Sequence, residues 1–69
     1  MFGTGEKEIL QANNKILYQI YEIQPQKDKP TVFKPIYWQI NYYDKKTDSW
    51  QRTDRFYSSK EARKAYRFI

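Results

Sequence analysis

Hydrophobic and more polar side chains alternate over residues 36–43, with the period of two that is typical of a β-strand. One side of this strand would hold Ile36, Trp38, Ile40 and Tyr42, and the other would hold Tyr37, Gln39, Asn41 and Tyr43. Residues 44–48 are polar and have the length of a hairpin turn, so residues 49–57 are predicted to form the return strand. The alternation is weaker in this second strand, and a bulge or an Arg52–Asp54 pair would explain the difference.

The last eleven residues change to the spacing of an amphipathic helix, which we predict from about residue 59 to 68. Ser58 is suited to cap this helix, and Glu61 follows at the position of a capping box. Two stripes would lie on opposite sides of the helix. The apolar stripe consists of Ala62, Ala65, Tyr66 and Ile69, and the other stripe, the basic helix face, consists of Lys60, Arg63, Lys64 and Arg67.

The N-terminal half gives weaker patterns. Residues 1–8 are small and polar and are expected to be frayed. Residues 9–23 fit either a helix with a stripe interrupted by Asn13 or a strand, and we favour a strand from 15 to 24, with one helical turn before it as an option. Residues 25–35 contain Pro25, Pro30 and Pro35, which predict a mobile loop.

Together these elements predict a single small domain, residues 1–69, of the α+β class. Its three-stranded antiparallel sheet would pack against the C-terminal helix. The expected core consists of Ile36, Trp38, Ile40, Trp50 and Phe56 against Ala62, Ala65, Tyr66 and Ile69. The other sheet face would expose Tyr37, Gln39, Asn41, Tyr43, Gln51, Thr53, Arg55 and Tyr57, and would be nearly free of acids.

The net charge of +5 is unevenly distributed. Basic and acidic side chains balance over residues 1–29, so the whole excess lies in residues 30–69. Such asymmetry favours a nucleic acid or an acidic protein surface as partner, although a solvated basic face would also keep a small domain soluble.

The chain contains no Cys and no His, which rules out disulfides, Cys/His zinc sites and Ser–His or Cys–His catalysis. With its carboxylates dispersed as well, we expect no enzyme activity, no metal, no cofactor and no small-molecule substrate. No apolar run approaches 18 residues, so no membrane span is predicted and a cytoplasmic location is expected.

The polar sheet face and the basic residues together predict a stand-alone nucleic-acid-binding protein, with duplex DNA as the favoured ligand. Side chains able to contact base edges are Gln39, Asn41, Gln51, Thr53 and Arg55, and those able to hold phosphates are Lys34, Lys45, Lys46, Lys60, Lys64 and Arg67. Exposed tyrosines could instead stack the unpaired bases of a single strand or RNA. The alternative is a small protein-interaction module that binds or inhibits a larger partner.

The segment from Trp38 to Tyr66 resembles the AP2-like arm-type DNA-binding domain of phage and transposon integrases. The matching residues are Tyr42-Tyr43-Asp44 at a strand end and Phe56-Tyr57-Ser58-Ser59-Lys60-Glu61-Ala62 at the start of the helix. The resemblance implies three antiparallel strands, a C-terminal helix and a sheet face that enters the major groove. It implicates Gln39, Asn41, Gln51, Thr53 and Arg55, and it transfers no catalytic residue. The chain has Lys45-Lys46-Thr47 where the family usually has a glycine in the turn.

Overall fold

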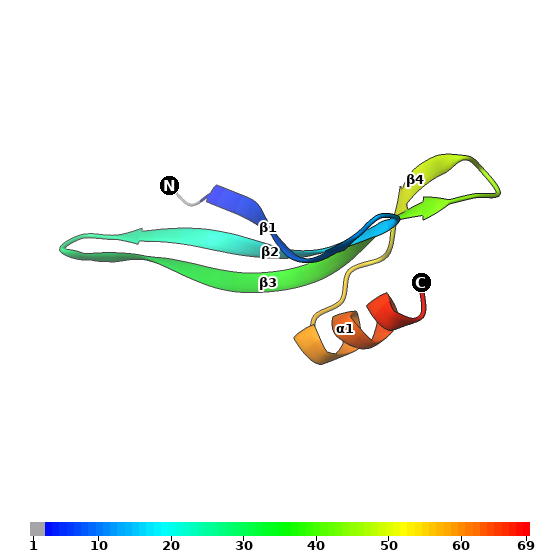
Figure 1. The fold of residues 1–69 in the computed structure, drawn as a ribbon. Coiled ribbons are helices and arrows are strands. Elements are labelled where there is room, and N and C mark those ends of the chain that lie inside the picture. Colours follow the sequence, from blue (N-terminus) through cyan, green and yellow to red (C-terminus); the bar gives the residue numbers. More distant parts are fainter. Residues whose placement is uncertain (1–2) are drawn as a thin grey trace.

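The computed structural model describes residues 3–69, which form one antiparallel sheet and one helix (Figure 1). The strands lie side by side in chain order: β1 (Gly3–Ala12), β2 (Lys15–Gln26), β3 (Lys29–Asp44) and β4 (Ser49–Arg52), followed by α1 (Ser59–Arg67). The predicted α+β class is confirmed, but the sheet has four strands instead of three. The additional strand is β1, so the prediction of fraying is wrong for residues 3–8, whereas residues 1–2 lie outside the described part.

The segment predicted as a mobile loop, residues 25–35, belongs to a long β-hairpin instead. The chain reverses at Lys27 and Asp28, where Asp28 has a left-handed φ of 63°. Pro25 lies at an irregularity between Gln24 and Gln26, and Pro35 lies opposite Tyr21 beside another. Prolines are tolerated at bulges and on edge strands because no ladder donor is required there. This part of β3 has only β2 as a neighbour, which explains why the prolines do not interrupt it.

The ambiguous segment, residues 9–23, forms two strands joined by a turn, so the helical alternative is wrong and the predicted strand from 15 to 24 is confirmed. Asn13 and Asn14 form the turn between β1 and β2. In contrast, the predicted strand 49–57 is confirmed only over Ser49–Arg52. Directly after β4, the Thr53 N–H still donates to the Ile40 carbonyl at 3.0 Å. The chain then meets β3 again at a single bridge, in which Trp38 and Phe56 exchange backbone hydrogen bonds of 2.8 Å. The β3–β4 turn needs no glycine, because Asp48 adopts the left-handed conformation, with a φ of 52°. Aspartate is one of the few residues besides glycine that tolerates this conformation.

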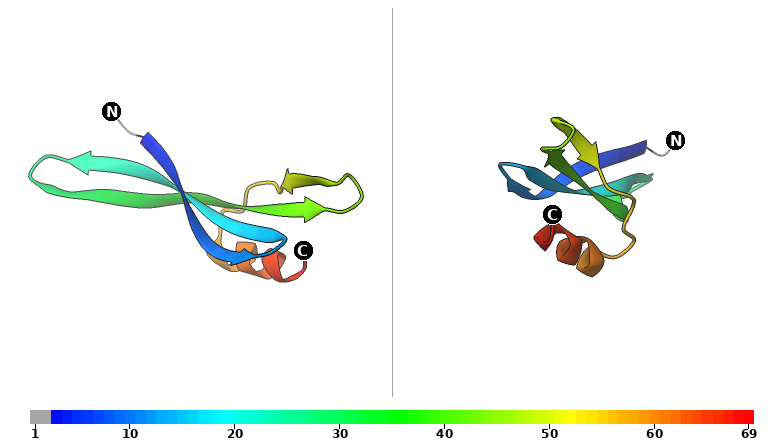
Figure 2. Two further views of the ribbon diagram at one scale, coloured as in Figure 1. Left: turned by 45° about the horizontal axis from the view of Figure 1, so that its top comes forward. Right: turned by 90° about the vertical axis from the view of Figure 1, so that its right-hand side faces the viewer.

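The core lies where α1 crosses β2 and β3, on one face of the sheet (Figures 1 and 2). Leu17, Ile40 and Ala62 are completely buried there. The side chains that pack against them are Ile9, Leu10, Trp38, Phe56, Ala65 and Tyr66. The predicted core is therefore correct for Trp38, Ile40 and Phe56 and for most of the helix stripe. It is wrong for Ile36, Trp50 and Ile69, which are 38%, 53% and 40% exposed, and it omitted Leu17.

The helix is fixed at both ends. The Ser58 hydroxyl accepts a hydrogen bond from the Glu61 backbone N–H at 3.4 Å, as the predicted N-cap requires. At the other end the Lys15 ammonium donates to the carbonyls of Tyr66 (2.7 Å) and Ile69 (3.2 Å), and it lies 4.4 Å from the centre of the Tyr66 ring. A cation at this position satisfies free carbonyls and complements the helix dipole. No helix within residues 3–69 is long and apolar enough to cross a membrane.

Candidate nucleic-acid interface

The basic helix face is directed away from the sheet. Ala62 is buried beneath the helix, and the four cations at Lys60, Arg63, Lys64 and Arg67 are exposed on the opposite side of the helix. Together with Phe68 they line one open hollow of about 450 Å³. No carboxylate among residues 3–69 forms an ion pair with any of them. The face therefore presents four positive charges over about 10 Å of helix, with no carboxylate of residues 3–69 in ion-pair contact.

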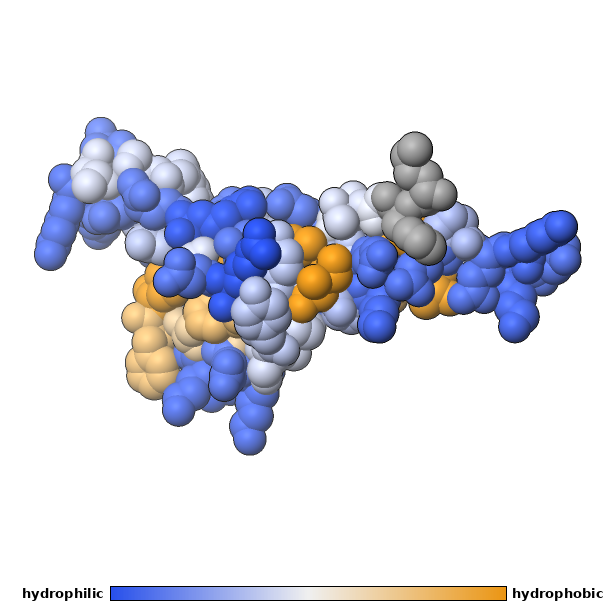
Figure 3. Space-filling view, turned by 180° about the vertical axis from the view of Figure 1, so that it is seen from behind, coloured by the Kyte–Doolittle hydropathy of each residue, from blue (hydrophilic) through white to orange (hydrophobic). Residues whose placement is uncertain are grey.

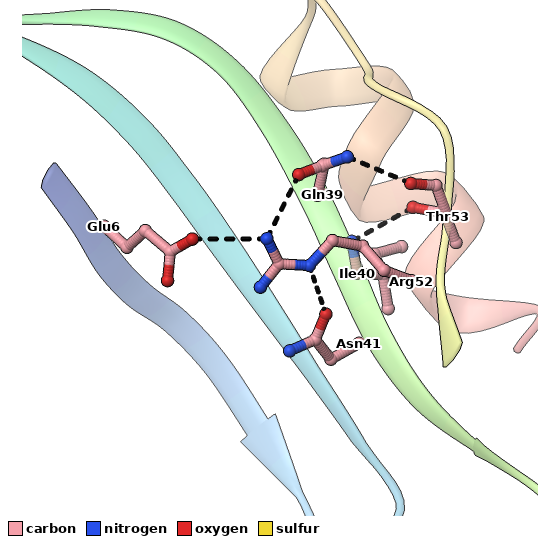
Figure 4. Close-up of polar contacts among 6 residues, drawn as sticks. All are labelled: Glu6, Gln39, Ile40, Asn41, Arg52 and Thr53. Atoms are coloured by element: carbon pink, nitrogen blue, oxygen red, sulfur yellow. Dashed lines mark hydrogen bonds and ion pairs between the residues drawn. The ribbon is translucent and has the colours of Figure 1, made fainter. Parts of the chain in front are cut away.

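The opposite face of the sheet, which we call the open face, is organised around Arg52 (Figure 4). The Arg52 guanidinium donates to the side-chain oxygens of Asn41 (2.7 Å), Glu6 (3.3 Å) and Gln39 (3.5 Å). It also lies 5.7 Å from the centre of the Tyr18 ring. The helix lies behind the sheet in this view, so the cluster faces away from α1. The expectation that this face is nearly free of acids is wrong, because β1 brings Glu6 onto it.

The residues predicted to contact base edges are mostly engaged within the protein. The Gln39 amide donates to the Thr53 carbonyl at 3.1 Å, and the Thr53 hydroxyl accepts from the Ile40 N–H, also at 3.1 Å. Through these two contacts, Thr53 continues the hydrogen bonding along β3 beyond the end of β4. Asn41 is held by Arg52. A base that paired with these groups would have to displace hydrogen bonds that the fold already makes.

Gln51 and Arg55, which were also predicted to contact base edges, lie apart from Asn41. In the register of β3 with β4, Asn41 pairs with Arg52 and Tyr42 pairs with Gln51. Because paired residues share a face and neighbours alternate, Gln51 points to the other side of the sheet, contrary to the prediction. Arg55 lies beyond β4 with its guanidinium carbon 4.4 Å from the centre of the Tyr37 ring. Arg52, which the predicted set did not include, takes the central position.

The predicted phosphate-holding residues separate into three places. Lys60, Lys64 and Arg67 belong to the basic helix face. Lys45 and Lys46 lie in the β3–β4 turn at one end of the 50 Å long axis, and Lys34 lies on the β2–β3 hairpin that forms the other end (Figure 1). Figure 3 shows that both ends are hydrophilic. Because the open face and the basic helix face lie on opposite sides of the sheet, one straight duplex cannot contact both at once.

Arg63 was part of the predicted helix stripe but was missing from the predicted phosphate-holding set. The stripe itself was the signal, since Arg63 lies three positions after Lys60 and four before Arg67. Trp50 is a second omission, because the weak alternation of residues 49–57 assigned it to the core. It is 53% exposed and packs edge-on against Tyr43 on the open face, with ring centres 6.0 Å apart. Within residues 3–69, no group of three carboxylates is placed to hold a metal ion.

No protein-family model matches this chain, and comparisons with curated proteins and with solved structures find no match either. Function is therefore inferred from the residues themselves.

Proposed function

We propose that this protein binds nucleic acid without catalysing a reaction, and that duplex DNA is its favoured ligand. The observation that supports the proposal is the basic helix face, with four cations in one row and no paired carboxylate among the described residues. With both strands counted, a duplex carries one phosphate per about 1.7 Å of axis, so those on its near side are available to the four cations along this helix.

The chemistry of the helix face favours a duplex over a single strand. Phosphate contacts position a protein on DNA, whereas single strands are usually held by stacking of their bases on aromatic side chains. The basic helix face has one neighbouring aromatic side chain, Phe68, and is otherwise cationic. Base readout by Gln39, Asn41, Gln51, Thr53 and Arg55, as the resemblance to arm-type domains implied, is a weaker part of the proposal because several of these side chains are engaged internally. We therefore propose binding with little sequence preference.

A salt titration with a fluorescent duplex and the matching single strand tests the proposal. Four phosphate contacts should give a slope of log affinity against log salt of about −3.6 for the duplex, and of about −2.8 if the single strand uses the same four contacts. The duplex should bind more tightly at low salt. Absence of binding to either nucleic acid at low salt, or a response that is flat in salt, would contradict the proposal.

A protein-interaction module is the second candidate, and the open face supplies the observation that favours it. Trp50 and Tyr57 are 53% and 69% exposed there, and Tyr57 lies edge-on to Tyr37 with ring centres 6.4 Å apart. Tyr, Trp and Arg are the residues that most often dominate protein interfaces. A flat salt response in the titration above would favour this second function.

A further inference from the structure

The outer part of the β2–β3 hairpin, residues 20–36, projects beyond the helix and is called the arm here (Figures 1 and 2). The arm makes the molecule unusually elongated, since the radius of gyration is 14.3 Å and a compact chain of this length would have about 11 Å. The accessible surface is 5533 Å², whereas a compact protein of 8.5 kDa would expose about 4,700 Å². The excess of about 850 Å² is close to the area that each partner buries in a standard interface.

One face of the arm is apolar, with Phe33 and Pro35 exposed and Tyr21 and Ile23 half-buried. The register pairs Ile23 with Phe33 and Tyr21 with Pro35, so these four side chains share a face. Phe33 is 60% exposed, and its ring lies edge-on to Tyr21 with ring centres 5.4 Å apart.

The neighbouring strand leaves room for the Tyr21 ring. Gly5 of β1 lies opposite Tyr21, and a Cβ atom at Gly5 would lie only 2.6 Å from the Tyr21 hydroxyl oxygen. The ring therefore lies across the glycine, and the apolar face continues over β1. Beside it, Glu6, Lys7 and Gln19 complete an open hollow of about 440 Å³ whose wall includes Tyr21 and Phe33. The exposed Phe33 ring thus lies next to a hollow that could hold an aromatic ring of a second molecule.

We propose that the apolar face of the arm is a self-association surface that packs against the same face of a second copy of this chain. A surface that carries both a projecting ring and a hollow is self-complementary. Under two-fold symmetry, the Phe33 ring of each copy can enter the hollow of the other. The surface that the whole elongated molecule exposes beyond a compact one is about what each partner of an ordinary dimer buries. The fully buried core is also small, with Leu17, Ile40 and Ala62 at its centre, and domains of this size without disulfides are commonly stabilised by oligomerisation.

Packing of faces is favoured over pairing of strand edges. The free edge of β3 in the arm carries Pro30 and Pro35 together with Lys29 and Lys34. Proline and lysine on an edge strand oppose the addition of another strand. The partner should therefore lie on the Tyr21–Phe33 face, with Phe33 of each copy entering the hollow of the other. This inference does not depend on nucleic-acid binding, because it concerns a different surface.

Light scattering after gel filtration, without nucleic acid, tests the inference. The wild-type protein should have twice the 8.5 kDa mass of the chain. Phe33→Thr, which keeps a residue suited to a strand, should give a folded monomer because the ring that fills the partner's hollow is lost. Val32→Thr is the matched control. Val32 is 40% exposed on the same strand but on its other face, so this variant should remain dimeric.

A second measurement keeps the test decisive if Phe33→Thr fails to fold. In a wild-type sample that mixes isotope-labelled and unlabelled chains, filtered NOE spectra should show contacts between the Phe33 ring of one copy and the Tyr21 ring of the other. A wild-type monomer would overturn the inference. A dimer without these contacts, or one that Phe33→Thr leaves intact, would overturn it as well, because the interface would then lie elsewhere.

Discussion

Replacing Lys60 and Lys64 with glutamine should weaken duplex binding about 60-fold at 0.1 M salt, because each lost phosphate contact reduces affinity about eightfold at that concentration. The slope of log affinity against log salt should fall from about −3.6 to about −1.8. Both lysines are exposed on the basic helix face, and glutamine is a good helix former, so the fold should be kept. Fluorescence anisotropy with a labelled duplex, combined with circular dichroism of each variant, measures both quantities.

The matched control replaces Lys45 and Lys46 in the β3–β4 turn with glutamine. This variant lowers the net charge from +5 to +3, as the helix variant does, but it removes charge from one end of the molecule. If the basic helix face is the binding surface, the variant at Lys45 and Lys46 should lose duplex affinity only a few-fold. This small loss would come from the weaker long-range electrostatic attraction between protein and DNA. Equal losses in the two variants would mean that affinity follows net charge alone, and the basic helix face would lose its assigned role.

Leu17→Ala should lower the free energy of unfolding by about 3 kcal/mol, because removing a buried leucine loses its transfer energy and leaves a cavity. Leu17 is completely buried between β1, β3 and the helix. Urea denaturation followed by circular dichroism measures the change.

Ile16→Ala is the matched control for Leu17→Ala. Ile16 is the preceding residue, points to the open face opposite Asn41, and is half-buried. Its truncation should cost about 1 kcal/mol, because the removed atoms are already partly hydrated and leave no closed cavity. A larger loss at Ile16 than at Leu17 would contradict the placement of the core under α1.

The C-terminal helix could be predicted from the sequence because all its determinants are local. The Ser58 cap, the apolar stripe and the basic stripe lie within twelve residues, and the structure confirms the helix and its cap. The long hairpin could not be predicted in this way. Three prolines normally indicate a loop, and whether a proline harms a strand depends on which neighbour the strand has. The strand over residues 15–24 was predicted, but its pairing with residues 29–35 was not.

The candidate site was predicted less completely than the fold. The basic helix face followed from helical spacing alone, but the open face depended on the register of β3 with β4. A one-residue change in register moves every side chain to the other face, and four paired residues of β4 give the sequence little to specify it. Gln51 was placed on the wrong face for this reason. The role of Arg52 also depends on Glu6 of β1, which lies 46 positions away in the chain.

Amide chemical shifts recorded while a short duplex is added to labelled wild-type protein show directly whether the basic helix face holds the phosphates. The largest shifts should occur at residues 59–68, with small shifts at Gln39, Asn41 and Thr53. Shifts concentrated on the open face, with residues 59–68 unchanged, would contradict the proposed role of the basic helix face.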